Sequence, residues 1–532
     1  MAARIDAPTL KASLSDGREL ALIDVRELGQ FGEGHLFFAV PLAYSRFELG
    51  LATLVPNPSV RLVLCDAGEG VAERAAARAE ALGYDNVAVL AGGIDAWRKA
   101  GYTLYAGVNV PSKTFGELVE LQRHTPRLSA PQVQAMRDAG ENFVIVDGRP
   151  FSEYSKMNIP GGVCCPNGEL PLRIHDIAPD AQTKIIVNCA GRTRSIIGAQ
   201  ILIDFGIANP VYALENGTQG WFLAGYGLEH GASRRYGEDR RSVDLAALQA
   251  RARRQAEKLA VEFVAPATAQ AWLNERSRTT YFLDVRSPEE FARSPVPGFA
   301  HAPGGQLMQA TDQWVGVKGA RLALLDDEAV RAPVIAGWLR QSGHEACVIE
   351  GGAAAAQRLT WRRAPTRAIP TTEPVVLSAS EAAQALRRGA LQAIDLRPST
   401  SYRRGHIAEA IWSIRPCITT ALKDKGKTVL LVADDPGIAR LAAVDLEEAG
   451  YGDVRRLAEG PEAWPAAGLA MVATPTEPTD AASIDFLFFT AKRHDGTAEA
   501  AAAARQYLAW EVGLIDQLDA QERGAFRIAA AP

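Results

Sequence analysis

Residues 185–200 read IIVNCAGRTRSIIGAQ, and this stretch decides the fold. An apolar run typical of a buried strand leads to Cys189, a short polar loop follows, and a pattern typical of an amphipathic helix comes next. A cysteine at such a point lies where backbone N–H groups and the positive end of a helix dipole converge, which favours thiolate over thiol. Arg192 and Arg194 add two cations to the loop. Cys189 is therefore the candidate nucleophile.

The strand–loop–helix unit belongs to a longer sequence repeat that occurs four times. Each copy opens with an apolar strand that ends in Asp, with Arg two residues later, at Asp24, Asp147, Asp284 and Asp395. Each copy continues with a helix start, a turn, a second apolar strand, a helix and a Gly-rich turn; a Trp follows that turn in three copies. A period of domain size with alternating strands and helices predicts tandem α/β domains built on parallel sheets.

This order of motifs resembles the rhodanese-like family over about residues 5–470. The signals are the Asp-x-Arg strand end, a Gly-His-Ile-Pro-Gly-like turn, the Cys loop before a helix and the Leu-x-Gly-Gly-x-x-x-Trp turn. The resemblance implies an α/β fold of four tandem doubly wound domains with parallel sheets, followed by a C-terminal helical tail. It also implies transfer of sulfane sulfur through a cysteine persulfide. The family includes copies that have lost the cysteine and act as structural or regulatory partners.

The expected domain boundaries follow the repeat. The four rhodanese-like domains are expected at residues 1–108, 126–232, 263–365 and 373–474, with Cys189 in the second. Residues 233–262 are expected to form a polar helix that joins a front pair of domains to a back pair. Residues 475–532 form the tail, in which a helix is expected over 497–521, docked on a domain.

The four loops differ at the residue that would carry sulfur. Asp326 and Ala433 stand where the second copy has Cys189, so the third and fourth domains are expected to be inactive. The first copy has Cys65 at this place, but carboxylates such as Asp66 follow it, and like charges raise the pKa of a thiol and repel an anionic donor. We expect the first domain to be inactive as well, while a part for Cys65 in sulfur relay stays open.

The expected substrate-binding set follows Cys189 in the loop and consists of Ala190, Gly191, Arg192, Thr193, Arg194 and Ser195. Gly191 is expected to take a positive φ, so that successive N–H groups point inward. The hydroxyls of Thr193 and Ser195 can donate to a thiolate or persulfide. The two arginines offer donors that match the oxygens of an anionic donor such as thiosulfate.

Three other residues are candidates for roles near this loop. Arg149, from the Asp-x-Arg motif, is expected to pair with Asp147 and is also a candidate for substrate contact. Cys164 and Cys165 follow a Gly-rich turn that, by the resemblance, approaches the loop. A part for them in sulfur relay stays open beside a purely structural one.

Alternatives to a thiosulfate sulfurtransferase also stay open. A cysteine phosphatase requires Cys-x5-Arg, and here Ser195 occupies the sixth position after Cys189, so the spacing disfavours this class. The donor could instead be 3-mercaptopyruvate, although two arginines favour a doubly charged donor. Because three of the four copies lack a complete loop, a scaffold, sulfur carrier or redox sensor with little turnover is the rival from another class. The acceptor is expected to be cyanide in an assay, or a thiol or protein.

Composition limits the remaining possibilities. The 532 residues carry a net charge of -5, which gives no basic surface for nucleic acid. No apolar run approaches the roughly 20 residues of a membrane span, and no signal peptide is visible. Six cysteines without a CxxC pair predict neither a disulfide framework nor a zinc site, so we expect a cytoplasmic protein with reduced thiols and no metal or organic cofactor. The oligomeric state stays open.

Overall fold

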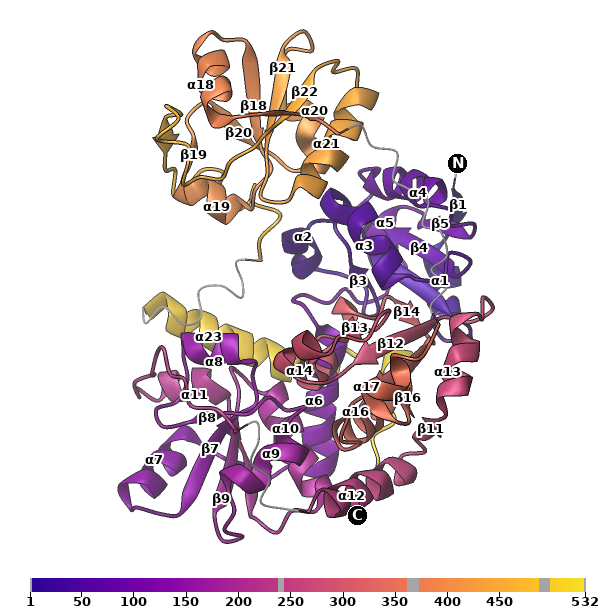
Figure 1. Ribbon diagram of the computed structural model, residues 1–532, viewed down its shortest axis with the longest axis vertical. Coiled ribbons are helices and arrows are strands. Elements are labelled where there is room, and N and C mark those ends of the chain that lie inside the picture. The colour runs from indigo at the N-terminus through magenta and orange to yellow at the C-terminus, as the bar shows by residue number, and fades with distance from the viewer. Residues whose placement is uncertain (1, 238–243, 361–372, 488–497, 531–532) are drawn as a thin grey trace. The chain divides into compact units, whose positions relative to one another are not determined.

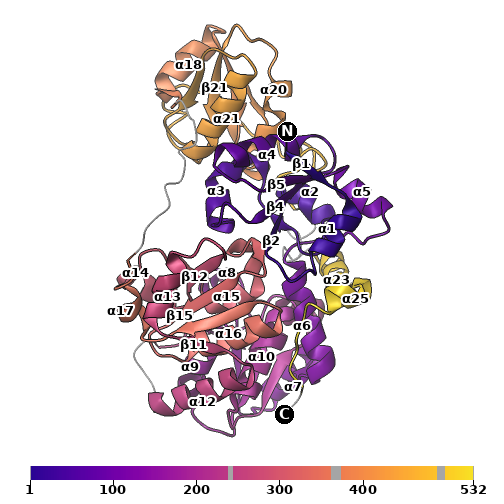
Figure 2. The ribbon, with the colours of Figure 1, turned by 90° about the vertical axis from the view of Figure 1, so that its right-hand side faces the viewer.

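A computed structural model of the chain describes residues 2–237, 244–360, 373–487 and 498–530 (Figures 1 and 2). The chain divides into two compact units. One comprises residues 1–14, 20–108 and 365–488, and the other comprises residues 15–19, 109–364 and 489–532. The first copy of the repeat therefore shares a unit with the fourth, and the second with the third. The expected front and back pairs do not form the compact units.

The elements of the first and fourth copies lie in the first unit. The first copy consists of β1 (Ala3–Ile5), α1 (Ala7–Ser13), β2 (Leu20–Asp24), α2 (Leu28–Glu33), β3 (Val40–Pro41), α3 (Phe47–Leu54), β4 (Arg61–Cys65), α4 (Val71–Ala81), β5 (Val87–Leu90) and α5 (Gly93–Lys99). The fourth consists of β17 (Val375–Leu377), α18 (Ala379–Arg387), β18 (Leu391–Asp395), α19 (Ser399–Arg404), β19 (His406–Ile407), β20 (Ala410–Trp412), α20 (Ile418–Ala421), β21 (Thr428–Val432), α21 (Pro436–Glu448), β22 (Val454–Leu457) and β23 (Met471–Val472).

The elements of the second and third copies lie in the second unit. After α6 (Val110–Arg123), the second copy consists of β6 (Arg127–Leu128), α7 (Ala130–Asp138), β7 (Phe143–Asp147), α8 (Phe151–Lys156), β8 (Val163–Cys164), α9 (Leu170–Ile177), β9 (Lys184–Asn188), α10 (Thr193–Phe205), β10 (Val211–Leu214) and α11 (Gly217–Leu223). After α12 (Leu245–Lys258), the third consists of β11 (Glu262–Val264), α13 (Pro266–Leu273), β12 (Thr280–Asp284), α14 (Pro288–Arg293), β13 (Ala300–His301), α15 (Gly304–Gln309), β14 (Val317–Lys318), β15 (Arg321–Leu325), α16 (Arg331–Gln341), β16 (Glu345–Ile349) and α17 (Gly352–Ala356).

All four sheets share one parallel topology, with helices packed around each sheet (Figure 1). In the second copy the strand order is β6-β10-β9-β7-β8, and the third and fourth copies repeat it as β11-β16-β15-β12-β13 and β17-β22-β21-β18-β20. The first copy has β1, β5, β4, β2 and β3 in the same order. The strand that leads into the loop is thus the central one in every copy. Loops at the carboxyl ends of parallel strands are the usual place for a binding site in such folds.

Each Asp-x-Arg motif forms a buried ion pair at the end of its strand. In the second copy, Arg149 Nη2 lies 2.7 Å from Asp147 Oδ2 and 2.6 Å from the carbonyl oxygen of Met157. The same pair, with a carbonyl eight residues after the Arg, is present at Arg26, Arg286 and Arg397. Since a buried charge without a partner is strongly destabilising, the two residues of the motif require each other. The motif is therefore structural in every copy.

The segments outside the repeat are also helical in part. Helix α6 lies in the sequence between the first and second copies, and the helix expected within the linker 233–262 is α12, whose Leu248 and Ala252 belong to a core cluster of the second unit. The single helix expected over 497–521 is instead three: α23 (Ala498–Val512), α24 (Leu514–Gln517) and α25 (Ala520–Arg523). Residue 497 lies outside the described residues. The tail docks as expected, since α23 and α24 pack on α6, as Figure 2 shows for α23.

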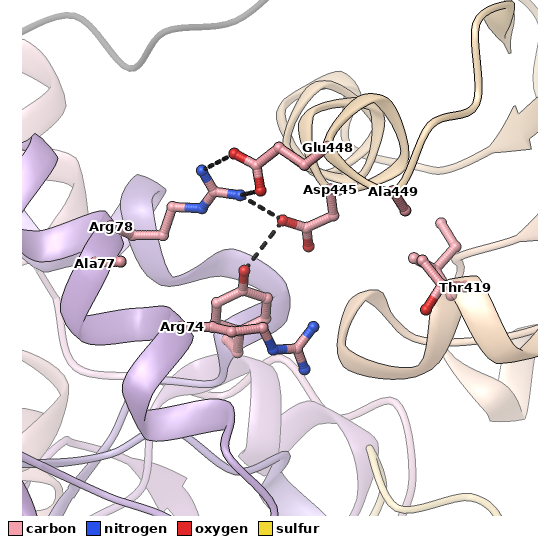
Figure 3. A pocket seen from close by; sticks show the side chains of 9 residues that line it. Arg74, Ala77, Arg78, Thr419, Asp445, Glu448 and Ala449 are labelled. Carbon is pink, nitrogen blue, oxygen red and sulfur yellow. Dashed lines mark hydrogen bonds and ion pairs between the residues drawn. The ribbon is translucent and has the colours of Figure 1, made fainter. Parts of the chain in front are cut away.

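In the first unit, charged side chains join the first and fourth copies. Arg78 of α4 donates to Glu448 and Asp445 of α21, and the Tyr44 hydroxyl also donates to Asp445 (Figure 3). These four side chains line a pocket of about 360 Å³. Of its two arginines, Arg78 is paired with these carboxylates and Arg74 donates to the carbonyl oxygen of Pro416. The pocket contains no residue of the loop 189–195.

Candidate active site

Cys189 lies between the end of β9 and the first turn of α10. Its side chain is 2% exposed, and the Ser195 hydroxyl donates to its sulfur at 3.1 Å. The residue before it, Asn188, donates from its amide nitrogen to Asp147 Oδ2 at 2.9 Å, which links the loop to the buried ion pair. Because β9 is the central strand and α10 begins only four residues after the cysteine, the sulfur faces a helix N-terminus, as the sequence predicts.

The loop is held from outside by the first turn of α11. The backbone N–H groups of Thr218 and Gln219 donate to the carbonyl oxygens of Cys189 at 2.8 Å and of Ala190 at 3.2 Å. Gly217 has φ +53, and a Cβ there would lie 2.3 Å from the Cys189 carbonyl oxygen. Only glycine therefore allows this approach. With its carbonyl groups engaged outward, the loop can direct its N–H groups toward the sulfur.

The four loops differ in what accepts from their backbone N–H groups. In the first, Asp66 accepts from two of them at 2.8 and 3.0 Å; in the third, Asp326 accepts from two at 3.1 and 3.0 Å; and in the fourth, Asp435 accepts from one at 2.8 Å. Within the described residues, no protein acceptor takes the N–H groups of residues 190–194. The second loop therefore has backbone N–H groups available to a ligand, whereas in each of the other loops a carboxylate of the same loop accepts from such groups.

Gly191 does not adopt the conformation expected from the sequence. The prediction of a positive φ is wrong, since Gly191 is absent from the residues in the left-handed region. Its lack of a side chain instead makes room for neighbours. A Cβ at Gly191 would lie 3.1 Å from Glu511 Oε2, 3.4 Å from Gln219 Nε2 and 3.4 Å from a ring carbon of Tyr507. The absence of a side chain at Gly191 lets these three side chains pack close to the loop, which a sequence pattern does not record.

Both loop arginines lie in ion pairs. Arg192 Nε lies 2.7 Å from Glu117 Oε1, and the same guanidinium pairs with Glu120. Arg194 Nη2 lies 2.8 Å from Glu153 Oε2. Burial opposes the charge on both arginines, but these carboxylates hold the pKa of each above its ordinary value. Carboxylates therefore balance the positive charges of both arginines at the loop.

A residue outside the predicted set also reaches the loop. Glu511 of α23 is 1% exposed, and its Oε1 accepts from Thr193 Oγ1 at 2.6 Å. Lys113 of α6 lies with its Nζ 3.7 Å from the same oxygen and donates to the Tyr507 hydroxyl. Figure 1 shows α23 in yellow beside α11. No local signal marks Glu511, because 318 residues separate it from Thr193.

Comparison with known proteins agrees with this architecture. The family model of the rhodanese-like domain matches the chain four times, over residues 6–100, 129–224, 266–358 and 378–467. The chain belongs to the rhodanese-like family. A crystal structure of a thiosulfate sulfurtransferase from Pseudomonas aeruginosa is similar at 40% sequence identity and a TM-score of 0.88, with 100% of each chain covered.

A second relative is similar to this chain over only part of its own length. The HTH-type transcriptional regulator Rv0324 of Mycobacterium tuberculosis is 31% identical over 102 residues, which are 19% of this chain and 44% of that protein. The chain therefore matches less than half of this curated relative. The likeness extends over about one rhodanese-like domain.

The other cysteines of the rhodanese-like domains are placed differently from Cys189. Burial raises the pKa of the Cys65 thiol well above its ordinary value, with Asp24 adding to the effect. Burial also raises the pKa of Cys164 to about 12 and that of Cys165 well above its usual range. Cys164 donates to the carbonyl oxygen of Arg149 at 3.5 Å. These thiols are held in their neutral form.

Two further findings concern partners. Across residues 2–237, 244–360, 373–487 and 498–530, no group of three or more His, Cys, Asp or Glu side chains is placed to hold a metal ion. Within the same residues, no helix has the length and apolar character that crossing a membrane requires.

Proposed function

We propose that this protein is a sulfurtransferase, which moves sulfane sulfur from thiosulfate or a similar anionic donor to cyanide or a thiol acceptor through a persulfide on Cys189. Membership of the rhodanese-like family and the full-length likeness to a thiosulfate sulfurtransferase support sulfur chemistry. One observation carries the assignment to this loop: it combines a cysteine with backbone N–H groups that no carboxylate of the described chain accepts from.

The first half-reaction loads the enzyme. The Cys189 thiolate attacks the outer sulfur of thiosulfate, a bond forms between Sγ and that sulfur, and the sulfur–sulfur bond of the donor breaks. Sulfite leaves with the electron pair of the broken bond. The loop N–H groups and the Ser195 hydroxyl point to where negative charge collects on sulfur, and preorganised donors of this kind stabilise it.

The second half-reaction regenerates the thiolate. Cyanide attacks the outer sulfur of the persulfide, a carbon–sulfur bond forms, and Cys189 leaves as thiolate while thiocyanate departs. A thiol acceptor reacts in the same way, loses its proton and becomes a persulfide. Atoms and electrons balance in both steps without a further oxidant, reductant or cofactor.

Arg192, Arg194 and Arg149 stay predictions as donor-binding residues. Arg192 would contact a donor through whichever of its N–H groups the carboxylates of Glu117 and Glu120 leave available. Arg149 would do so from within its pair with Asp147. Their nearness to the loop supports an electrostatic part in either case.

We further propose that the other three domains, with the boundaries expected from the sequence, are inactive partners. The third supports the active loop, since Gln306 of α15 accepts from Arg194 at 3.3 Å. The fourth shares the first domain's unit. We place the protein in the cytoplasm, where its six free cysteines would stay reduced.

Intact mass after incubation with thiosulfate tests the proposal. We expect wild type to gain one sulfur atom and to release thiocyanate on addition of cyanide. Cys189→Ser should do neither, whereas the matched variant Cys65→Ser should do both. An adduct that persists in Cys189→Ser and disappears in Cys65→Ser would move the activity to the first domain. No adduct from thiosulfate but one from 3-mercaptopyruvate would change the donor, and none from either would favour the scaffold or sensor.

A further inference from the structure

The carboxylate of Glu511 faces the catalytic loop with one oxygen unused. Its Oε1 accepts from Thr193, whereas Oε2 is buried and accepts no hydrogen bond from any described residue. That free oxygen is the atom that a Cβ on Gly191 would meet at 3.1 Å. A buried acceptor without a donor is unfavourable, so such groups commonly mark a place where a ligand supplies the missing partner.

The charges around this oxygen disfavour anions. Lys113 is the cation in contact with the Glu511 carboxylate, at 3.7 Å from Oε1. Arg192 contributes little net positive charge, because Glu117 and Glu120 pair with it. An anionic group that approached Glu511 Oε2 would therefore meet the Glu511 carboxylate with its charge only partly balanced. At the effective dielectric of a protein site, repulsion over a few ångströms changes affinity by about tenfold or more.

We propose that Glu511 is a specificity-determining residue of the Cys189 site: it disfavours donors whose anionic group comes near its Oε2 and favours donors that present an N–H or other hydrogen-bond donor to that oxygen. The inference rests on the proposed function, because it assigns a preference to that same site. It implies that thiosulfate is accepted in spite of Glu511. The preferred donor presents a polar group without negative charge beside its sulfane sulfur.

Two alkylating reagents of nearly equal size test this preference without sulfur transfer. Iodoacetate carries a carboxylate, whereas iodoacetamide carries an amide whose N–H groups can donate to Oε2. Both react with the thiolate, so the ratio of their rates at Cys189 cancels any change in thiolate fraction. The rates are followed by mass spectrometry of the Cys189 peptide, which separates this thiol from the exposed Cys417.

In Glu511→Gln we expect the iodoacetate-to-iodoacetamide rate ratio to rise about tenfold, because the negative charge is removed while an acceptor for Thr193 is kept. The matched control is Glu499→Gln, which removes an exposed carboxylate from the same helix and should leave the ratio unchanged. A ratio that does not rise in Glu511→Gln, or that rises equally in Glu499→Gln, overturns the proposal.

A second variant guards against misfolding of the first. Lys113→Gln removes the cation beside Glu511, so the ratio should fall several-fold; an unchanged or higher ratio also overturns the proposal. The experiments distinguish a failure of the proposal for Glu511 from a failure of the proposed sulfurtransferase function. A shifted ratio without a sulfur adduct on Cys189 would uphold Glu511 and overturn the sulfurtransferase, whereas an adduct with an unshifted ratio would do the reverse.

Discussion

At the scale of single residues, reactivity depends on which donors surround a sulfur atom. Cys189 and Cys65 stand at the same position of the repeat, and both are buried. Cys189 receives a hydrogen bond from Ser195, whereas Asp66, next to Cys65, accepts from the N–H groups of its own loop. The same residue type therefore has different hydrogen-bonding neighbours in the two copies.

The Ser195 hydroxyl makes a testable contribution. Ser195→Ala removes the hydrogen bond to the Cys189 sulfur, and a hydrogen bond to a charged group, such as the thiolate of the proposed reaction, contributes about 1.5–3 kcal/mol. We expect the rate of Cys189 alkylation by iodoacetamide at neutral pH to fall roughly tenfold. The matched control is Ser152→Ala, an exposed serine of α8, which should react like wild type. Equal rates in all three proteins would show that the loop N–H groups alone sustain the thiolate.

At the scale of elements, one strand–loop–helix unit serves two purposes. In the second copy the loop between β9 and α10 leaves its N–H groups to a ligand. In the third copy, Asp326 accepts from two backbone N–H groups at the corresponding loop. Arg331, at the start of α16, pairs with Glu169 of the second copy at 3.1 Å. The loop that has Asp326 instead of a cysteine thus takes part in a contact between domains.

The Gly-His-Leu turn after α2 predicts a pH dependence. Burial lowers the pKa of His35 to about 4, and its ring stacks on Phe31 at 3.8 Å between centroids. The unfolded chain takes up a proton near pH 6.5 that the folded chain does not, so stability is retained above pH 6.5 and lost as pH falls toward 4. The loss amounts to about 3 kcal/mol for the first domain.

His35→Gln should remove this acid-sensitive part. The free energy of unfolding is measured at neutral pH and near pH 4.5 by urea unfolding, which is followed by circular dichroism. The difference between the two pH values should shrink relative to wild type, whereas His230→Gln, at an exposed histidine, should keep it. An undiminished difference in His35→Gln would mean that other groups dominate acid unfolding.

At the scale of the whole molecule, each compact unit contains a buried arginine that joins two domains. Arg415 donates to Glu48 of the first domain at 2.5 and 2.7 Å. Arg331 of the third domain has a similar role in the other unit, where it pairs with Glu169 of the second domain and with Glu290 of its own domain. Removing one partner of a buried ion pair leaves the other charge unpaired and costs about 3–5 kcal/mol.

Calorimetry should therefore resolve two transitions, one for each unit. Arg415→Met should lower the midpoint of one of them, and Arg331→Met should lower that of the other. Arg98→Met and Arg293→Met, at exposed arginines, should shift neither. If Arg415→Met and Arg331→Met lower the same transition, the two units do not unfold independently.

Much of this architecture was predictable from the sequence. The four copies, their parallel sheets, the buried Asp–Arg pairs and the position of Cys189 before a helix all follow from patterns within a few residues. Periodicity and strand-end motifs report local backbone preferences, and those preferences survive in the tertiary structure because each copy forms its own parallel sheet.

Contacts between distant residues were decided only by the tertiary structure. The pairing of the first domain with the fourth, the carboxylates that neutralise Arg192 and Arg194, and the approach of Glu511 to the loop join segments that no local pattern relates. Gly191 shows the reason most clearly: its lack of a Cβ serves neighbours supplied by α23 rather than its own φ. Which side chains share a buried space depends on packing, and packing depends on the whole chain.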